Sequence, residues 1–160
     1  MSSGLRKLKS ADGQVFEVDE SILKTSKYLR DLIENNYPDL DQEININQIE
    51  SKYLCKIIDY LRHYENIKPK KIPKPLTDSN LKSILSQWDY TFINSMSLEE
   101  CIDLLNGANL LEINGLINLS SAKIASEMLN GPIEQVREKF GIKSDMNPEE
   151  QKRYEKYKLE

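Results

Sequence analysis

Three consecutive amphipathic helices are predicted between Ser97 and Asp145, and they carry more apolar side chains than one small domain needs for its own core. A capping box of Ser97 and Glu100 marks the start of the first helix. Spacings of three and four then predict one apolar stripe of Leu98, Cys101, Ile102, Leu105 and Ala108. Leu104 and Leu111 lie off that stripe. We therefore expect these helices to be buried on two sides, in their own core or against a partner.

The next two helices continue this pattern. The second is expected from about residue 115 to 129, with apolar residues around much of its surface: Ile117, Ile124 and Met128 on one face, and Leu119, Ala122, Ala125 and Leu129 around the rest. The third is expected to begin at Pro132 and to end at Gly141, where Ile142 suits a left-handed helix cap. Val136 and Phe140 lie on this third helix.

The first 65 residues predict a mixture of strands and helices. Asp12-Gly13, between Leu5–Ser10 and Gln14–Val18, is typical of a hairpin with a two-residue turn. A short helical turn after Asp19 and a helix capped by Thr25 or Ser26 are expected to follow. Alternation over residues 43–47 predicts a third strand, and residues 49–65 predict a long helix.

Residues 66–80 form a linker rich in proline and lysine, and they interrupt regular structure. The lysines are Lys68, Lys70, Lys71 and Lys74. A solvated linker is favoured over a contact with an anion, because no aromatic residues accompany the lysines to stack on bases. A single short helix containing Leu81, Trp88 and Phe92 is expected to fix the linker to the core.

Composition excludes several classes of function. The net charge of −4 gives no general attraction to nucleic acid or to an anionic membrane, and no apolar run reaches about 18 residues. The N-terminus has no apolar signal core, so a cytoplasmic or nuclear location is expected. Cys55 and Cys101 sit in apolar helical patterns and are interpreted as buried small hydrophobic residues.

No catalytic constellation is apparent in the sequence. His63 is the single histidine and is interpreted as structural. No cysteine–histidine cluster has the spacing of a zinc site, and no glycine-rich phosphate loop or nucleophile elbow is present. We therefore expect an interaction module without a metal, a cofactor or a catalytic site, rather than an enzyme.

Four stretches of sequence occur in a specific order: LKSADGQVFEVDESIL, the Trp88-Asp89 pair, LLNGANLLEINGLINL and VREKFGIKSDMNPEE. Together they resemble the S-phase kinase-associated adaptor family, the SKP-type subunits of cullin–RING ubiquitin ligases. The resemblance implies an α-rich α+β fold of the BTB/POZ type, with a small three-stranded sheet and a C-terminal helical extension. We expect the BTB/POZ domain over residues 1–112, including the linker, and the extension over residues 113–160.

The same resemblance implies an adaptor that bridges a cullin scaffold and an F-box substrate receptor. The expected F-box contacts are apolar: Cys101, Ile102, Leu105, Ile117, Ile124, Val136 and Phe140. The cullin-facing motif of the family, Ala-Asn-Tyr-Leu, stands here as Ala108-Asn109-Leu110-Leu111, which implies that Asn109 and Leu110 contact the N-terminal domain of the cullin. Leu110 replaces the tyrosine of the family, so this contact loses ring area and a hydroxyl.

Other departures indicate a divergent member. The proline of the family's Thr-Pro-Glu-Glu motif stands one place early, at Pro132. The hydroxylation and glycosylation that this proline carries in some lineages of the family are therefore not assigned to Pro132. Where the family has a Trp-Cys tail, this sequence has Tyr157-Lys158-Leu159-Glu160, so either that tail is lost or Tyr154 and Tyr157 replace it weakly. Two alternatives remain open: an elongin C-like adaptor, and a self-associating BTB module. A homodimer of the free chain also remains open.

Overall fold

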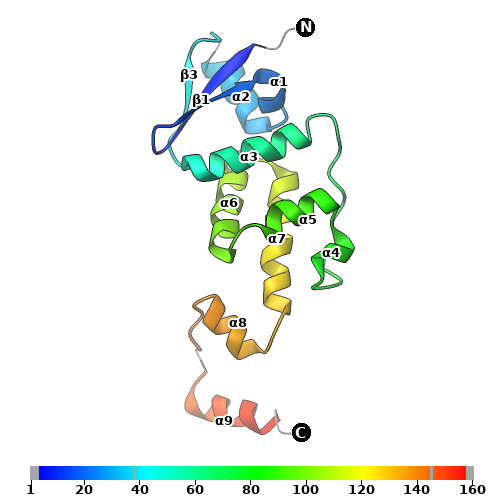
Figure 1. The fold of residues 1–160 in the computed structure, drawn as a ribbon. Coiled ribbons are helices and arrows are strands. Elements are labelled where there is room, and N and C mark those ends of the chain that lie inside the picture. Colours follow the sequence, from blue (N-terminus) through cyan, green and yellow to red (C-terminus); the bar gives the residue numbers. More distant parts are fainter. Residues whose placement is uncertain (1–3, 38, 145, 158–160) are drawn as a thin grey trace.

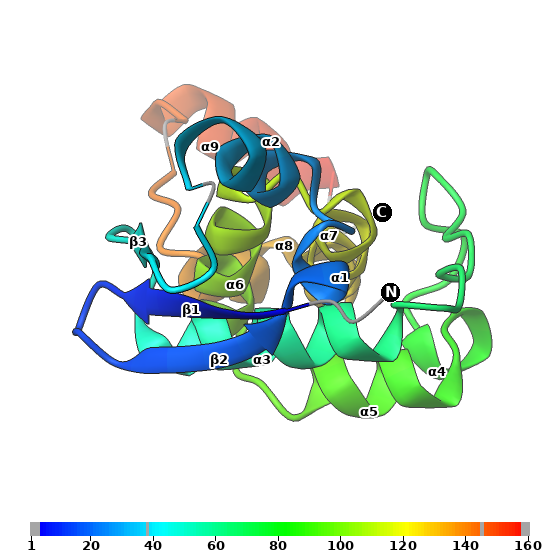
Figure 2. The same ribbon diagram turned by 90° about the horizontal axis from the view of Figure 1, so that it is seen from above.

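A small mixed sheet lies at the N-terminal end of the chain. The computed structural model describes residues 4–37, 39–144 and 146–157. In it, β1 (Leu5–Ser10) pairs antiparallel with β2 (Val15–Asp19) and parallel with β3 (Glu43–Ile46), so the strand order is β2-β1-β3. Figure 2 shows β1 and β2 side by side. Alternate residues such as Leu8 and Ile44 point into the core, as the period of two predicts.

The hairpin between β1 and β2 has a longer turn than Asp12-Gly13 predicts. Ser10 and Gln14 form the last pair, with 2.9 Å between the Ser10 nitrogen and the Gln14 oxygen, so the loop has three residues, 11–13. Gly13 takes a positive φ of 85°, which is the usual ending of a three-residue hairpin loop. Asp12 lies within this loop, and its carboxylate accepts hydrogen bonds from Ser51, which begins a later helix.

Three helices pack against the sheet. The short α1 (Glu20–Leu23) is followed by α2 (Lys27–Asn36), whose first turn is capped by the Ser26 hydroxyl, as predicted. The long α3 (Ser51–His63) spans the molecule beneath them (Figure 1) and turns Leu54, Ile57, Ile58 and Leu61 inward. Tyr60 of the same helix is also buried.

Residues 64–80 connect α3 to two further helices without a strand or helix of their own. The segment does not stay free of the core, because Ile72 and Leu76 are partly buried against it. The single helix predicted after the linker is two, α4 (Leu81–Ile84) and α5 (Gln87–Asn94). The break falls at Leu85, which is extended, and the Ser86 hydroxyl accepts from the Asp89 N–H to start α5.

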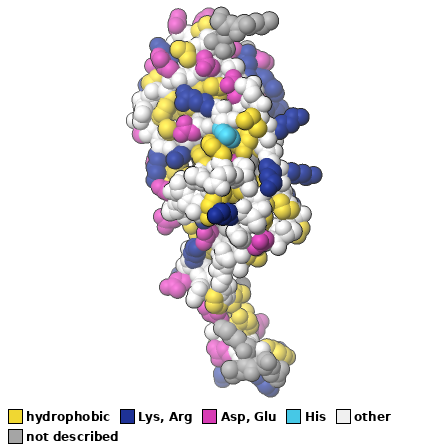
Figure 3. Space-filling model, turned by 45° about the vertical axis from the view of Figure 1, so that its right-hand side comes forward, with side chains coloured by type: hydrophobic (Ala, Val, Ile, Leu, Met, Phe, Trp, Pro, Cys, Tyr) yellow, Lys and Arg dark blue, Asp and Glu magenta, His cyan; other side chains and the backbone are white. Residues whose placement is uncertain are grey.

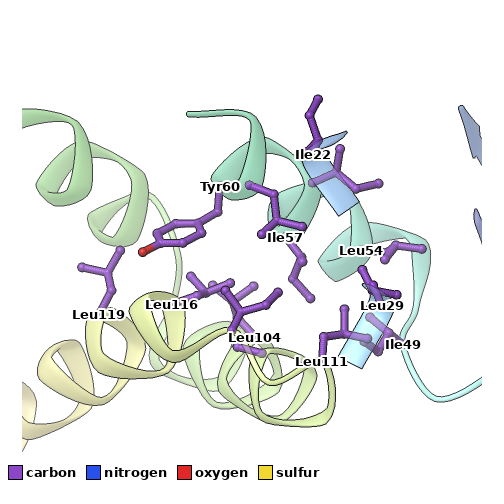
Figure 4. Close-up of a cluster of buried hydrophobic side chains, with 14 of the residues drawn as sticks. Ile22, Leu29, Ile49, Leu54, Ile57, Tyr60, Leu104, Leu111, Leu116 and Leu119 are labelled. Carbon is purple, nitrogen blue, oxygen red and sulfur yellow. The ribbon is translucent and has the colours of Figure 1, made fainter. Parts of the chain in front are cut away.

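The main helical core lies between α3, α6 (Leu98–Leu110) and α7 (Asn114–Leu129), as Figure 4 shows. The capping box at the start of α6 forms as predicted. Its inward stripe differs from the prediction, because the fully buried residues are Cys101, Leu104, Ala108 and Leu111. Both stripes have helical spacing, and only the position of α3 decides which of them faces the core.

Two C-terminal helices extend away from this core (Figure 1): α8 (Ile133–Lys139) and α9 (Pro148–Tyr157). No residue within these two helices is buried. The cap predicted at the end of α8 is present, since Gly141 has a φ of 64° and the Ile142 N–H donates to the Arg137 carbonyl over 2.8 Å. Of the predicted tail, residues 158–160 lie outside the described part of the chain.

The two cysteines occupy different environments, and both are free thiols. Cys101 is buried, as expected, but the prediction for Cys55 is wrong because its side chain is exposed on the outer flank of α3. Leu54 and Ile58 take the inward positions of that helix, and Cys55 lies about 100° from Leu54. No helix that the structure describes is both long enough and apolar enough to span a lipid bilayer.

Candidate protein-interaction sites

Cys101 is the one expected F-box contact that lies within the core. Its side chain is fully buried, and its Sγ atom lies 3.9 Å from the Ile93 carbonyl oxygen. Burial raises the pKa of this thiol to about 11. Cys101 is therefore a packing residue of α6 in the free chain, and we correct its assignment as a direct partner contact.

The other expected F-box residues have some surface exposed. Ile102, on the outer side of α6, is 37% exposed, and Leu105 one turn later is half-buried. Ile117 and Ile124 on α7 are partly buried against the core, while Val136 and Phe140 are half-buried in and after α8. These six residues remain predicted contacts. Ile102 is the most exposed of them, since the other five are half-buried.

A further group of apolar side chains near the end of α7 and along α8 is more exposed than the predicted contacts. We call this group the C-terminal apolar residues: Met128 (45% exposed), Leu129 (57%), Ile133 (44%) and Ile142 (51%). Figure 3 shows hydrophobic side chains gathered on the narrow part of the molecule that leads to its C-terminal end. The apolar pattern of residues 115–129 indicated two buried sides, but the sequence did not show that the core ends before Met128.

One carboxylate joins α8 to α7 beside these apolar residues. Glu127 accepts from the Lys123 ammonium group over 2.7 Å and also pairs with Lys139 of α8. The two hydrogen bonds from lysine hold the pKa of Glu127 below its usual value. This ion pair and the short connection at Gly131 join α8, which has no buried side chain, to α7.

The two expected cullin contacts lie in one shallow cleft. Asn109 and Leu110, at the end of α6, face Ile49 and Tyr53 across a cleft of about 420 Å³. The Tyr53 hydroxyl donates to the Asp103 carboxylate over 2.8 Å, and this bond raises the pKa of Tyr53 to about 12. Sequence reasoning missed the contribution of Tyr53, which reaches this cleft from a helix some fifty residues earlier.

An aromatic cluster covers the end of α3 and explains the Trp88-Asp89 pair. The His63 ring stacks on Trp88 with 3.8 Å between centroids, and Figure 3 shows the histidine among hydrophobic side chains. Asp89 is buried, and it accepts from the Tyr64 hydroxyl over 2.7 Å and from the Ser86 hydroxyl over 2.8 Å. Burial, followed by the bond to Asp89, raises the pKa of Tyr64. The pair thus fixes α5 on α3.

The part of the chain that the structure describes contains no group of three or more histidine, cysteine or acidic side chains able to hold a metal ion. Instead, the surfaces built by α3, α6, α7 and α8 are apolar or shallow and suit macromolecular contacts. The molecule is thus a helix-rich interaction protein with a three-stranded sheet.

Comparison with known proteins gives the family. Residues 5–66 match the model of the Skp1 family, tetramerisation domain, and residues 114–158 match that of the Skp1 family, dimerisation domain. The chain is 34% identical to the S-phase kinase-associated protein 1 homolog of Tetrahymena thermophila over 91% of this chain and 86% of that protein. It is 33% identical to SKP1-like protein 3 of Arabidopsis thaliana, over 90% and 87%. The chain belongs to the Skp1 family, and its fold is of the BTB/POZ type.

Proposed function

We propose that this protein is the adaptor subunit of an SCF-type cullin–RING ubiquitin ligase, bridging the cullin scaffold to F-box substrate receptors for ubiquitin-dependent degradation. The observation that supports it most is the group of C-terminal apolar residues, which extends the apolar surface of α7 onto a helix with no core of its own. An F-box is itself a small helical domain, and its apolar face is a suitable cover for such a surface.

In this proposal the two parts of the chain have different partners. Residues 1–112 contact the N-terminal domain of the cullin through the cleft at Asn109 and Leu110, and residues 113–160 hold the F-box together with Ile102 and Leu105 near the end of the first part. The adaptor performs no chemistry, and the rate of ubiquitin transfer increases because the substrate is held near the charged conjugating enzyme. Such a complex operates in the cytoplasm or the nucleus.

The receptor side of the proposal is tested by placing a charge on α7. Ile124 is packed partly against the core, so Leu129, which is 57% exposed, gives a cleaner substitution. We expect Leu129→Asp to weaken binding of an F-box fragment by about tenfold or more, since burying an unpaired carboxylate opposes association. Isothermal titration calorimetry measures the loss. Leu40→Asp, at a leucine 47% exposed elsewhere on the molecule, is the matched control and is expected to bind normally.

The cullin side is tested by a separate double variant. Asn109→Lys with Leu110→Lys introduces two charges into the cleft beside Tyr53 and is expected to weaken cullin binding while sparing the F-box. Both partners are titrated against the same double variant, and its circular dichroism is compared with that of the parent. Equal loss of both partners by a folded variant contradicts the assignment of the two surfaces to different partners.

The two alternatives make different predictions. An elongin C-like adaptor ends shortly after the helix that carries Asn109, whereas this chain continues through α7, α8 and α9. The match of residues 114–158 to a Skp1 domain model therefore favours the SKP-type adaptor. A self-associating module buries the C-terminal apolar residues between copies of the chain, so Leu129→Asp then changes the oligomeric state and not receptor binding.

A further inference from the structure

A cleft of about 530 Å³ lies on a face of the molecule that the proposed function does not use. It is bounded by the end of α3, the start of the linker and the connection between α6 and α7. Ile67, Pro69 and Ile113 provide an apolar wall, while Lys27 and Lys68 bring positive charge to the rim. The predicted F-box and cullin residues do not line this cleft.

The N-terminus of α7 opens into this cleft. The helix has 16 residues, and its N-cap residue, Ile113, has no side chain that can accept a hydrogen bond. Asn114 and Gly115 are both cleft residues, and their backbone N–H groups belong to the first turn, where a helix offers no acceptor of its own. The positive end of the helix dipole and two uncapped N–H groups are therefore available to an anion.

A buried tyrosine hydroxyl supplies a second, independent donor at the same place. Tyr60 is only 2% exposed, and Figure 4 shows its ring extending from α3 toward Leu116 and Leu119 of α7. No hydrogen bond joins its hydroxyl to another described residue, and the hydroxyl is not one of the fully enclosed polar atoms that lack a partner, so its oxygen opens onto the cleft. Burial raises the pKa of Tyr60, so the hydroxyl keeps its proton at neutral pH and is able to donate it. The hydroxyl is therefore a donor without a protein acceptor, and a ligand in the cleft is able to accept its hydrogen bond.

Gly115 is what brings this hydroxyl to the helix end. A Cβ atom at this position would lie 2.4 Å from the Tyr60 hydroxyl oxygen and 3.1 Å from a ring carbon of Pro69. The missing side chain thus lets the hydroxyl lie against the first turn of α7. The donor set consists of this hydroxyl and the uncapped N–H groups of Asn114 and Gly115.

The charges around the cleft favour an anion once the linker is included. Lys27 and Lys68 are offset by Glu65 and Glu112 at the same rim. An adjoining cleft shares Pro69 and Gly115 with this one, and it is lined by three further lysines: Lys70, Lys71 and Lys74. Lys74 donates to the Asn118 side chain over 2.7 Å, which holds that part of the linker on α7. The surroundings are therefore basic overall.

We propose that this cleft binds a phosphate group, with the anion at the N-terminus of α7, the Tyr60 hydroxyl as a donor and the linker lysines as the surrounding positive charge. Donors of this kind suit a tetrahedral oxyanion, free or carried by a small monoester. The apolar wall of Ile67 and Pro69 favours a monoester with an apolar group over inorganic phosphate.

The test is a titration of the ¹⁵N-labelled full chain followed by amide chemical shifts, at constant pH and ionic strength. Inorganic phosphate and phenyl phosphate are the two probes, and sodium chloride is the control for ionic strength. We expect a saturable shift of the Gly115 amide with both probes and tighter binding of phenyl phosphate. A shift with inorganic phosphate alone assigns the site to the free anion. No saturable shift with either probe, or the same shift with chloride, overturns the proposal.

Tyr60→Phe is the decisive variant, because it removes only the unpartnered hydroxyl and keeps the buried ring. We expect it to weaken phosphate binding about fivefold or more, while its urea midpoint stays the same or rises. Tyr53→Phe is the matched control, since that hydroxyl is bonded to Asp103 and Tyr53 does not line this cleft; this variant is expected to bind phosphate normally. Equal affinity of Tyr60→Phe and the parent chain contradicts the site. These results do not depend on F-box or cullin binding.

Discussion

At the scale of single residues, Asp12 connects the hairpin to the long helix α3. Its carboxylate accepts from the Ser10 hydroxyl over 2.6 Å, from the Ser51 hydroxyl over 2.5 Å and from the Ser51 N–H over 2.8 Å. These three bonds lower the pKa of Asp12 to about 2 from an ordinary 3.8. The helix start at Ser51 is thus capped by a residue from the loop between β1 and β2.

The lowered pKa makes a prediction about stability and pH. A carboxyl whose folded pKa is depressed stabilises the fold above its unfolded pKa and loses that effect as pH falls toward 2. We therefore expect Asp12→Asn to unfold at a lower urea concentration than the parent at pH 7, and the difference to shrink near pH 2. Urea titrations at the two pH values measure this. A gap of the same size at both values contradicts a role for the ionised carboxylate.

A second single-residue prediction concerns Glu112, which has a positive φ of 52° at the end of α6. The Glu112 N–H donates to the Asn109 carbonyl, and the Ile113 N–H donates to the Ala108 carbonyl. Glu112 therefore occupies the position at which helices usually have glycine. Glu112→Gly is expected to stabilise the chain by about 1 kcal/mol, because it relieves this strain. Urea denaturation of Glu112→Ala, which keeps a Cβ atom, provides the control and should show no comparable gain.

At the scale of secondary-structure elements, the sequence predicts those features that depend only on residues close to one another in the chain. The capping box at Ser97 and Glu100 and the glycine cap at Gly141 depend only on neighbouring residues, and both are present. Features that depend on distant partners were not predictable. The turn at Asp12-Gly13 is three residues long, and its aspartate is bonded to Ser51 of a later helix.

The same limit applies to the candidate sites. The stripes of α6 and α7 identified apolar surface, but Cys101 faces the core while its neighbour Ile102 faces outward. Helical spacing is the same for both stripes, so it does not show which of them faces the core. The position of α3, which lies far earlier in the sequence, decides this. For the same reason the exposure of Leu129 and Ile133 was not evident from the sequence.

The attachment of α8 gives a prediction for this element. Because α8 has no buried side chain and is joined to α7 by the pairing of Glu127 with Lys139, its amides are expected to exchange hydrogen quickly in the free chain and slowly when an F-box fragment is bound. Hydrogen–deuterium exchange read by mass spectrometry tests this. Glu127→Gln is expected to speed exchange in α8 of the free chain only, whereas Glu138→Gln, an exposed carboxylate of the same helix, serves as control.

At the scale of the whole molecule, the sheet and the long α3 form one end and the weakly attached α8 and α9 form the other (Figure 1). The cleft with Asn109 and Leu110 lies between α3 and α6, whereas the C-terminal apolar residues lie on α7 and α8 and just after α8. This separation allows two partners to bind at the same time. The cleft at the start of α7 is separate from both and is lined by the end of α3 and the linker.

A bridging adaptor must bind the F-box and the cullin at the same time, and the size of the complexes in solution shows whether it does. The full chain is mixed with an F-box fragment and a cullin N-terminal domain, alone and together, and each mixture is analysed by size-exclusion chromatography with light scattering. We expect a one-to-one complex with each partner and a ternary complex containing one copy of each. A homo-oligomer that binds neither partner, or two partners that displace one another, would contradict a bridging adaptor.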